Sequence, residues 1–271
     1  MREEARRVAL TIAGSDSGGG AGIQADLKTF QAFGVFGTSA LTAVTAQNTL
    51  GVAAVHAVPV EVVRGQIDAV AQDLRPNAVK TGMLATAALV EGVAAALREN
   101  RLGPYVLDPV MVASSGDRLL DRGAESALVR HLFPLAALVT PNLDEARILT
   151  GRAVRDLTAM REAARVLVDL GASAALVKGG HLPGADAVDV LWDGTDERTW
   201  KRPMMSTRNT HGTGCTLSAA VTAGLALGLP LGDAVDVALD YVARAIASAP
   251  DLGGGHGPVN HFTEVRRPSR G

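Results

Sequence analysis

The residues with the clearest chemical potential form the segment Asn209–Thr216, which reads Asn-Thr-His-Gly-Thr-Gly-Cys-Thr. An apolar run, Leu217–Leu227, follows at once, so two glycines stand where a loop is expected to pass into a helix. Glycine lets the backbone approach a ligand closely, and the first amides of a helix lack intrahelical partners and lie at the positive end of its dipole. Such a helix end binds phosphate. The segment predicts an anion-binding loop, although a glycine-rich loop before a buried helix would have the same sequence.

Cys215 stands at the start of this predicted helix, where the pKa of a thiol tends to fall. The segment thus joins an anion site to a candidate base or nucleophile, which suggests phosphoryl transfer. Cys215 is also the single cysteine of the chain, so no intrachain disulfide forms and cysteine-based zinc motifs are excluded.

Composition excludes several classes of function. Hydrophobic residues make up 47% of the chain and charged residues 20%, as in soluble globular proteins. A net charge of -2 and an aromatic content of 3% argue against a nucleic-acid partner. The first seven residues lack an apolar signal core and are expected to form a flexible extension. The longest apolar stretch, Ala219–Leu229, is shorter than the roughly 20 residues that cross a bilayer. We therefore expect a cytoplasmic protein with no membrane partner.

Short apolar runs alternate with longer amphipathic ones, which is typical of βαβ units and a parallel sheet. The predicted strands are Val8–Ala13, Ser39–Thr45, Val52–Ala57, Ala78–Thr81, Tyr105–Asp108, Ala137–Thr140, Ala174–Lys178, and a hairpin of Ala187–Trp192 and Arg198–Arg202 around Asp193-Gly194. The predicted helices are Gln24–Phe33, Val60–Leu74, Thr86–Asn100, Ala124–His131, Asn142–Leu149, Ala159–Leu170, Gly214–Leu227 and Leu231–Ala249. We expect one three-layer α/β/α domain over residues 1–271 with a mostly parallel central sheet.

Polar residues cluster directly after the predicted strands. They are Gly14-Ser15-Asp16, Gln47-Asn48, Lys80-Thr81-Gly82, Asp108-Pro109, Thr140-Pro141-Asn142 and Lys178-Gly179-Gly180. Because ligands of open α/β sheets bind beyond the carboxyl ends of the strands, these segments predict one shared site.

Two familiar nucleotide motifs do not fit. The stretch from Gly20 to Ala25 matches the spacing of a dinucleotide fingerprint, but no acidic residue occurs between Asp26 and Glu61 to bind a ribose. A Walker A loop needs a Gly-Lys pair, and the sequence contains none. A glycine loop beside a small substrate fits the first segment better.

Three charged residues are candidates for a metal–phosphate site. Asn142 and Glu145 have the spacing of a helix capping box. The alternative role for Glu145 is to lie near a Mg²⁺–phosphate cluster, because Mg²⁺ needs only one or two carboxylates. Asp108 ends a strand and is either a second acidic ligand or a turn residue. Lys178 either neutralises phosphate charge or extends from its strand end into solvent.

Other polar residues are less specific. The six histidines show no compact metal-binding spacing; His181 and His211 either bind phosphate or hydrogen-bond their loops. The polar segment Ser114-Ser115-Gly116 is either a lid or a simple turn.

Taken together, these segments resemble the hydroxymethylpyrimidine/phosphomethylpyrimidine kinases of thiamine biosynthesis, in the ribokinase-like superfamily. The resemblance runs through nearly the whole chain, and the order and spacing of the motifs carry it. The motifs are Ala13–Asp26, Ala46–Thr49, Lys80–Leu84, Asp108–Met111, Ser115–Asp117, Thr140–Leu143, Lys178–His181, Asn209–Thr216 and Gly255–Val259.

The resemblance implies a homodimeric, ATP- and Mg²⁺-dependent enzyme. It would phosphorylate 4-amino-5-hydroxymethyl-2-methylpyrimidine and then convert that monophosphate to the diphosphate. Gln47 matches the residue that reads the pyrimidine edge, and its amide offers both donors and an acceptor. The other implied substrate contacts are Gly14, Ala21, Asp26, Met83 and Val110.

The resemblance also assigns the phosphoryl-transfer groups. The implied catalytic residues are Cys215, Lys178, Gly212 and Gly214; those for ATP are Asn142, Glu145, Lys178, Thr210, Gly212, Thr213 and Gly214; those for Mg²⁺ are Asp108 and Glu145. Many sugar kinases of the superfamily carry an aspartate where Cys215 stands, so this residue favours a vitamin-precursor substrate. A pyridoxine or pyridoxal kinase and a non-catalytic ligand-binding protein are the alternatives.

Overall fold

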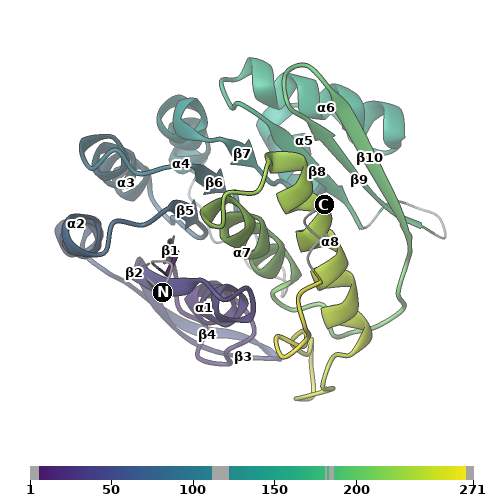
Figure 1. Cartoon of the computed structure of the whole chain (residues 1–271), viewed down its shortest axis with the longest axis horizontal. Coiled ribbons are helices and arrows are strands. Elements are labelled where there is room, and N and C mark those ends of the chain that lie inside the picture. Colours follow the sequence, from purple (N-terminus) through teal and green to yellow (C-terminus); the bar gives the residue numbers. More distant parts are fainter. Residues whose placement is uncertain (1–5, 112–121, 181, 183–185, 267–271) are drawn as a thin grey trace, which may run out of the picture.

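The computed structural model describes residues 6–111, 122–180, 182 and 186–266. In chain order (Figure 1), its elements are β1 (Val8–Ala13), α1 (Gly22–Ala32), β2 (Phe36–Leu41), β3 (Ala43–Asn48), β4 (Gly51–Ala57), α2 (Val60–Asp73), β5 (Ala78–Thr81), α3 (Ala87–Glu99), β6 (Tyr105–Leu107), α4 (Arg122–Ala127), a π-helical turn (Leu128–Leu132), a 3₁₀ turn (Phe133–Leu135), β7 (Leu138–Val139), α5 (Leu143–Thr150), α6 (Leu157–Asp169), β8 (Ala175–Gly179), β9 (Asp186–Trp192), β10 (Glu197–Pro203), α7 (Thr213–Ala226) and α8 (Leu231–Ala247).

The main sheet has the strand order β10-β9-β8-β7-β6-β5-β1-β2. Strands from β2 to β8 along this sheet are parallel, while β9 and β10 add an antiparallel hairpin at one edge. The predicted α/β class and the hairpin around Asp193-Gly194 are therefore confirmed. At the opposite edge, the carbonyl of Arg7 accepts the amide of Phe36 at 2.8 Å, so the end of the expected N-terminal extension already joins the sheet.

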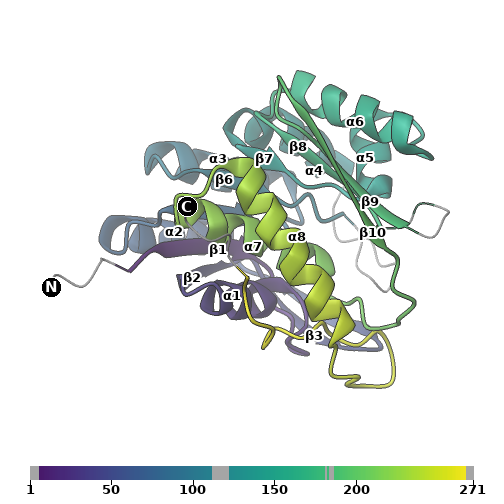
Figure 2. The same ribbon diagram turned by 45° about the vertical axis from the view of Figure 1, so that its right-hand side comes forward.

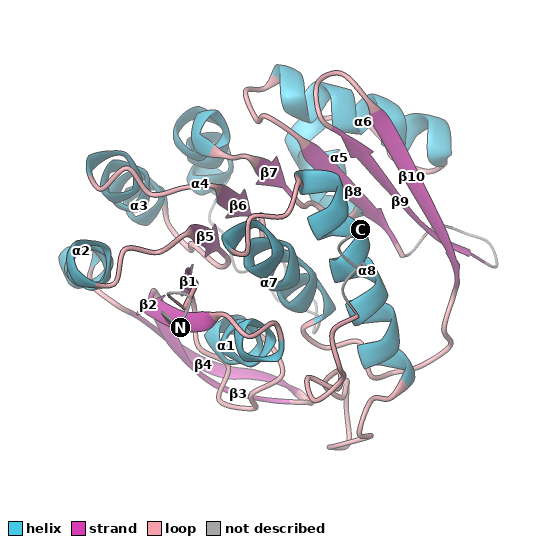
Figure 3. Ribbon diagram, viewed as in Figure 1, coloured by secondary structure: helices cyan, strands magenta, loops and turns pink. Residues whose placement is uncertain are grey.

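Helices cover both faces of the sheet (Figure 3). Helices α2 to α6 lie on one face, and α1, α7 and α8 lie on the other. Along β1 the side chains alternate between these layers: Leu10 and Ile12 join the first core and Ala9 joins the second. Figure 2, turned by 45°, shows α8 lying across the outer side of α7. Helix α7 is consequently buried almost all round, as its apolar sequence requires.

The predicted strand Ser39–Thr45 is wrong. The chain leaves the main sheet at Leu41 and enters a separate two-stranded antiparallel sheet, β3–β4, at Ala43. Between them, the amide of Thr42 still bonds to Ala13 at 3.0 Å, while its carbonyl accepts the amide of Val58. The β-propensity is continuous through this segment, so the sequence does not reveal the change of sheet. The change places β3 beside the polar segment after β1.

The predicted helix Ala124–His131 also needs correction. Helix α4 ends at Ala127, and the chain continues as the π-helical and 3₁₀ turns up to Leu135. Among the described residues, no helix is both long and apolar enough to span a membrane.

Candidate active site

A cavity of about 860 Å³ lies where the parallel strands end. Its lining includes residues from the segments that follow β1, β5, β6, β7 and β8. Other lining residues come from β3 and from the start of α7. The predicted site residues that line it are Gly14, Ala21, Gln47, Met83, Asp108, Val110, Asn142, Glu145, Lys178, Thr210, Gly212, Thr213, Gly214 and Cys215. The structure thus brings these segments together at one edge of the sheet.

Asp26 is the predicted substrate contact that does not line the cavity. It is fully buried on α1, where its carboxylate is 2.7 Å from Nζ of Lys80 and accepts the hydroxyl of Thr11 at 2.6 Å. Its carboxylate oxygens are therefore occupied by neighbours within the core. Burial raises the pKa of Asp26 despite the opposing effect of Lys80.

The loop before α7 has the backbone geometry of an anion site. Gly212 has φ +79°, and a side chain there would collide with the carbonyl oxygen of Gly20. Only glycine satisfies both the left-handed conformation and this close approach. The loop ends at Thr213, the first residue of α7, whose amide bonds to the carbonyl of Thr210 at 3.2 Å. Gly214 and Cys215, which follow in the first turn before the bond from the amide of Thr216 to Gly212, line the cavity.

The glycine-rich segment after β1 supports that loop. Asp16 organises it by accepting the amides of Gly18 at 2.8 Å, Gly20 at 3.1 Å and Ala21 at 2.8 Å. Because Gly20 packs against Gly212, the segment serves as the partner of the anion loop. This contact explains Gly20 without a dinucleotide ligand.

Three charged groups meet in the cavity wall. The Nζ of Lys178 lies 3.4 Å from Oδ1 of Asp108, and Asp108 also accepts the hydroxyl of Ser218 at 3.1 Å. Burial by itself lowers the pKa of Lys178, but the carboxylates of Asp108 and Glu145 raise it above its usual value. Lys178 is therefore a cation at neutral pH, directed into the site.

Glu145 combines a structural and a chemical role. It forms the expected capping box: its carboxylate accepts the amide of Asn142 at 2.8 Å, and the amide oxygen of Asn142 accepts the Glu145 amide at 2.9 Å. Burial raises the pKa of Glu145 to about 7, with Asp108 adding to the rise and Lys178 opposing it. The buried negative charge at Glu145 and Asp108 is thus only partly balanced by Lys178.

This donor set fits a magnesium ion held mainly by phosphate and water. Asp108 and Glu145 supply two hard oxygen donors in one wall of the cavity, and Mg²⁺ needs no more than that from protein. Within the described residues, no group of three histidine, cysteine or acidic side chains gathers as a dedicated metal cage.

The lowered thiol pKa expected at the helix end is wrong. Cys215 is half-buried, and burial raises its pKa to about 12, although Lys80 and the amide of Gly22 act in the opposite direction. Asp26 and Asp108 add to the rise. Desolvation thus outweighs the helix dipole, and the group remains a thiol at neutral pH.

The cavity is also lined by residues that sequence reasoning missed. Asp189 pairs with Arg202 and accepts the amide of Gly179 at 3.2 Å, directly beside the strand end that carries Lys178. An apolar lining follows, formed by Met204, Met205, Leu239, Val242, Ala243 and Ile246. The antiparallel register of β8 and β9 places Asp189 opposite Lys178, which no local pattern indicates. Ser114-Ser115-Gly116 and His181 lie outside the described residues.

Comparison with known proteins identifies the family to which the chain belongs. A family model described as phosphomethylpyrimidine kinase matches residues 16–260. The chain belongs to this family. The resemblance inferred from the motifs is confirmed, and with it the expectation of a phosphotransferase of thiamine biosynthesis.

Individual relatives agree. The hydroxymethylpyrimidine/phosphomethylpyrimidine kinase of Rhizobium meliloti is 53% identical over 259 residues, which cover 94% of this chain and 97% of the relative. A thiamine biosynthesis bifunctional protein of Geobacter sulfurreducens is 54% identical over 253 residues, but the chain spans only 52% of its length. An ADP complex of Bacillus subtilis pyridoxal kinase has a TM-score of 0.89 at 40% identity, covering 96% of this chain and 98% of that one.

Proposed function

We propose that this kinase transfers the γ-phosphoryl group of ATP first to the hydroxymethyl group of 4-amino-5-hydroxymethyl-2-methylpyrimidine and then to the resulting monophosphate. The observation that carries this proposal is the convergence, in one cavity, of Gln47 with the charged wall and the anion loop. The similarity to the Rhizobium meliloti kinase, over nearly the full length of both chains, supports the substrate.

The ring of the substrate would bind near Gln47. The amide of Gln47 lines the cavity together with Gly14, Ala21, Met83 and Val110, which supply little polarity. An aminopyrimidine presents a ring-nitrogen acceptor beside an amino donor, and a glutamine amide complements both. Asp26 is left out of this assignment because it is sealed beneath the cavity.

Phosphoryl transfer would depend on electrostatics and position. The amides at Gly212, Gly214 and Cys215 bind the transferring group, and Lys178 balances its charge. Asp108 and Glu145 would hold Mg²⁺, which neutralises phosphate charge when it is bound. Cys215 positions the attacking hydroxyl as a neutral thiol, because its pKa of about 12 leaves almost no thiolate at neutral pH.

The nucleotide would occupy the other end of the cavity. The similarity to a kinase solved with ADP supports ATP as the donor. We assign the adenine to the apolar lining that Met204 and Met205 form together with Val242, Ala243 and Ile246 of α8. Thr210 and Thr213 line the cavity on the phosphate side, and Asn142 belongs to the wall that carries Glu145.

Two further features belong to the same proposal. Val44, Leu50 and Val55 expose apolar surface on β3, β4 and their connection, which supports a homodimer through this small sheet. The dimer is expected in light scattering of the purified chain. A single cysteine is compatible with the cytoplasm.

Pyridoxal is the second candidate substrate, because the pyridoxal kinase of Bacillus subtilis superposes with a TM-score of 0.89. Mass spectrometry of products from the chain, MgATP and either ring compound separates the two functions. Pyrimidine monophosphate followed by diphosphate is the expected result. Pyridoxal phosphate alone would move the assignment to vitamin B6 salvage, and no product in either reaction would contradict both.

A further inference from the structure

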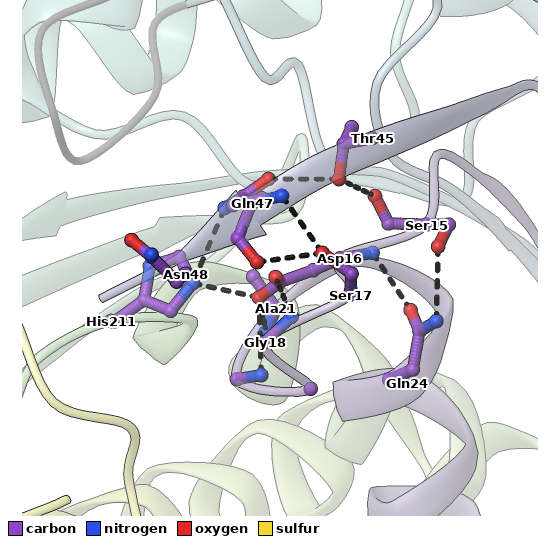
Figure 4. A network of polar contacts seen from close by, with 12 residues as sticks. Ser15, Asp16, Ser17, Gly18, Ala21, Gln24, Thr45, Gln47, Asn48 and His211 are labelled. Atoms are coloured by element: carbon purple, nitrogen blue, oxygen red, sulfur yellow. Dashed lines mark hydrogen bonds and ion pairs between the residues drawn. The ribbon is translucent and has the colours of Figure 1, made fainter. Parts of the chain in front are cut away.

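A partly buried hydrogen-bond network links the glycine segment, Gln47 and the anion loop (Figure 4). At its centre, the carboxylate of Asp16 accepts three backbone amides and lies 2.8 Å from Nε2 of His211. Burial alone raises the pKa of Asp16, but the hydrogen bond and charge of His211 and the amides of Ala21 and Gly18 lower it overall. Asp16 is therefore ionised at neutral pH and can only accept hydrogen bonds.

This fixes the proton on His211. Since Oδ2 of Asp16 has no hydrogen to give, Nε2 of His211 must carry one and donate it. The contact with Asp16 selects the neutral tautomer that carries its hydrogen on Nε2, and the charged imidazolium carries one there as well, so the conclusion does not depend on the charge of the ring. Consequently, Nε2 has no lone pair with which to accept, and a second donor beside it is unfavourable.

That next atom belongs to Gln47. Its Nε2 lies 3.4 Å from Nε2 of His211, and its Oε1 lies 3.3 Å from the hydroxyl oxygen of Thr45. Thr45 directs its own hydrogen to the carbonyl of Ser15 at 2.8 Å, so its oxygen is available to accept. A half-turn of the amide exchanges Oε1 and Nε2. It removes the donor–donor contact with Nε2 of His211, whose single hydrogen goes mainly to Asp16, and it lets the amide nitrogen donate to the oxygen of Thr45. Two independent neighbours, His211 and Thr45, thus favour the same orientation.

We propose that Asp16 and His211 are positioning residues that turn the carbonyl of Gln47 toward His211 and thereby set the direction in which the pyrimidine binds. The proposal rests on the proposed substrate. In that substrate the amino group and the hydroxymethyl group occupy adjacent ring carbons. The amino group donates to the Gln47 carbonyl, so it lies on the His211 side, and the ring nitrogen accepts from the Gln47 amide nitrogen on the Thr45 side.

The orientation has a direct consequence for catalysis. Because the hydroxymethyl group neighbours the amino group, it is also carried to the His211 side of the ring. His211 immediately precedes Gly212, where the anion loop passes into α7. With the opposite amide orientation, the ring would bind reversed and its hydroxymethyl group would lie on the Thr45 side. His211 therefore couples recognition of the ring edge to placement of the reacting oxygen.

The first test measures the proton directly. Nitrogen-15 NMR of the full chain with labelled histidine rings, at pH 7.5, reports which ring nitrogen carries hydrogen. We expect Nε2 of His211 to be protonated, with its signals assigned by their loss in His211→Phe or His211→Gln. A bare Nε2 would overturn the proposal, and this result requires neither substrate nor turnover.

The second test compares two rings in His211→Phe. The 4-amino substrate and its 4-oxo analogue present opposite donor–acceptor patterns to Gln47, because the oxo compound carries hydrogen on the ring nitrogen. The wild-type chain should prefer the amino compound in kcat/KM, and the ratio should fall by about tenfold or more in the variant, as a reversed buried hydrogen bond implies. A merely structural role would lower both values and leave their ratio unchanged.

Lys28→Met is the matched control. Lys28 is exposed and donates to the carbonyl of Gly19 at 2.7 Å, so its removal loosens the same glycine segment without touching Gln47. Its amino-to-oxo ratio should equal that of the wild type. An unchanged ratio in His211→Phe would overturn the inference while leaving the kinase function intact. A wild-type chain that phosphorylates neither pyrimidine would instead contradict the proposed function.

Discussion

Two lysine–aspartate pairs lie close to the reaction centre, and they differ in access. Lys80 and Asp26 are 2.7 Å apart, and both side chains are 0% exposed. Lys178 and Asp108 are 3.4 Å apart, with exposures of 14% and 2%, and both line the cavity. The first pair satisfies its charges within the fold. The second is looser and keeps part of its charge directed toward the space where phosphate is expected.

The comparison shows that residue type alone does not identify a functional ion pair. Both lysines stand near the end of a strand and precede glycine within two residues. A sealed pair can be separated only at a high desolvation cost, so its contribution is to the fold. An open pair can exchange its partner for a ligand, which suits Lys178 to a substrate that carries negative charge.

The largest effect is expected from breaking the sealed pair. Lys80→Met leaves the carboxylate of Asp26 buried without its cation, which should lower the free energy of unfolding by about 3–5 kcal/mol. Urea unfolding followed by circular dichroism measures this. Adding Asp26→Leu should restore much of the stability, because both charges are then removed. Lys201→Met, on an exposed position of β10, should change stability by less than about 0.5 kcal/mol. Equal free energies of unfolding for Lys80→Met and Lys201→Met would contradict the structural role assigned to the Lys80–Asp26 pair.

Removing the open pair's cation should act on rate instead. In Lys178→Met the transferring phosphoryl group loses its charge partner, and kcat should fall by roughly 10²–10³-fold, the usual effect of losing such a group. The free energy of unfolding should change much less than in Lys80→Met, since Asp108 retains the hydroxyl of Ser218 and access to the cavity. Initial rates and urea unfolding on the same preparations separate the two effects. A folded Lys178→Met enzyme with wild-type kcat would show that this lysine is structural too.

His261 is a further buried titratable group, and its partner is a hydroxyl instead of a carboxylate. His261 contacts the hydroxyl of Thr216 at 3.0 Å, and burial, with a smaller contribution from Lys28, lowers its pKa from 6.5 to about 4. The unfolded chain therefore binds more protons between these values. Stability should be fully present above pH 6.5 and be lost as pH falls toward 4, by up to about 3 kcal/mol.

The measurement is the free energy of unfolding between pH 4 and 7 for the wild type and His261→Asn. The variant cannot titrate at this position, so its curve should be flatter over that interval. Parallel curves would assign the acid sensitivity to other groups and leave His261 as an ordinary core residue.

The sequence predicts the layers and most of the site for one physical reason. Parallel strands end at a common edge, so polar residues that follow them, such as Asp108 and Lys178, must converge. The change of sheet at Thr42 could not be predicted, because both strands have similar propensity and only long-range pairing separates them. Likewise, the sealing of Asp26 depends on Lys80, 54 residues away.

The smallest effect is expected at Cys215, where burial decides whether the side chain is an ionised base or a neutral thiol. At the start of a helix a thiol is expected to ionise easily, yet burial raises the pKa of Cys215 to about 12. If the thiol only positions the substrate hydroxyl, Cys215→Ser should lower kcat by less than about tenfold, because serine retains a small group that accepts and donates hydrogen bonds. The kcat–pH profiles of the two enzymes should have the same shape from pH 6 to 9. A fall in kcat of about 10³-fold, together with loss of a basic limb that the wild-type kcat–pH profile shows, would instead assign Cys215 as the base. Cys215 would then belong with Lys178 to the groups of the open cavity that act directly in the reaction.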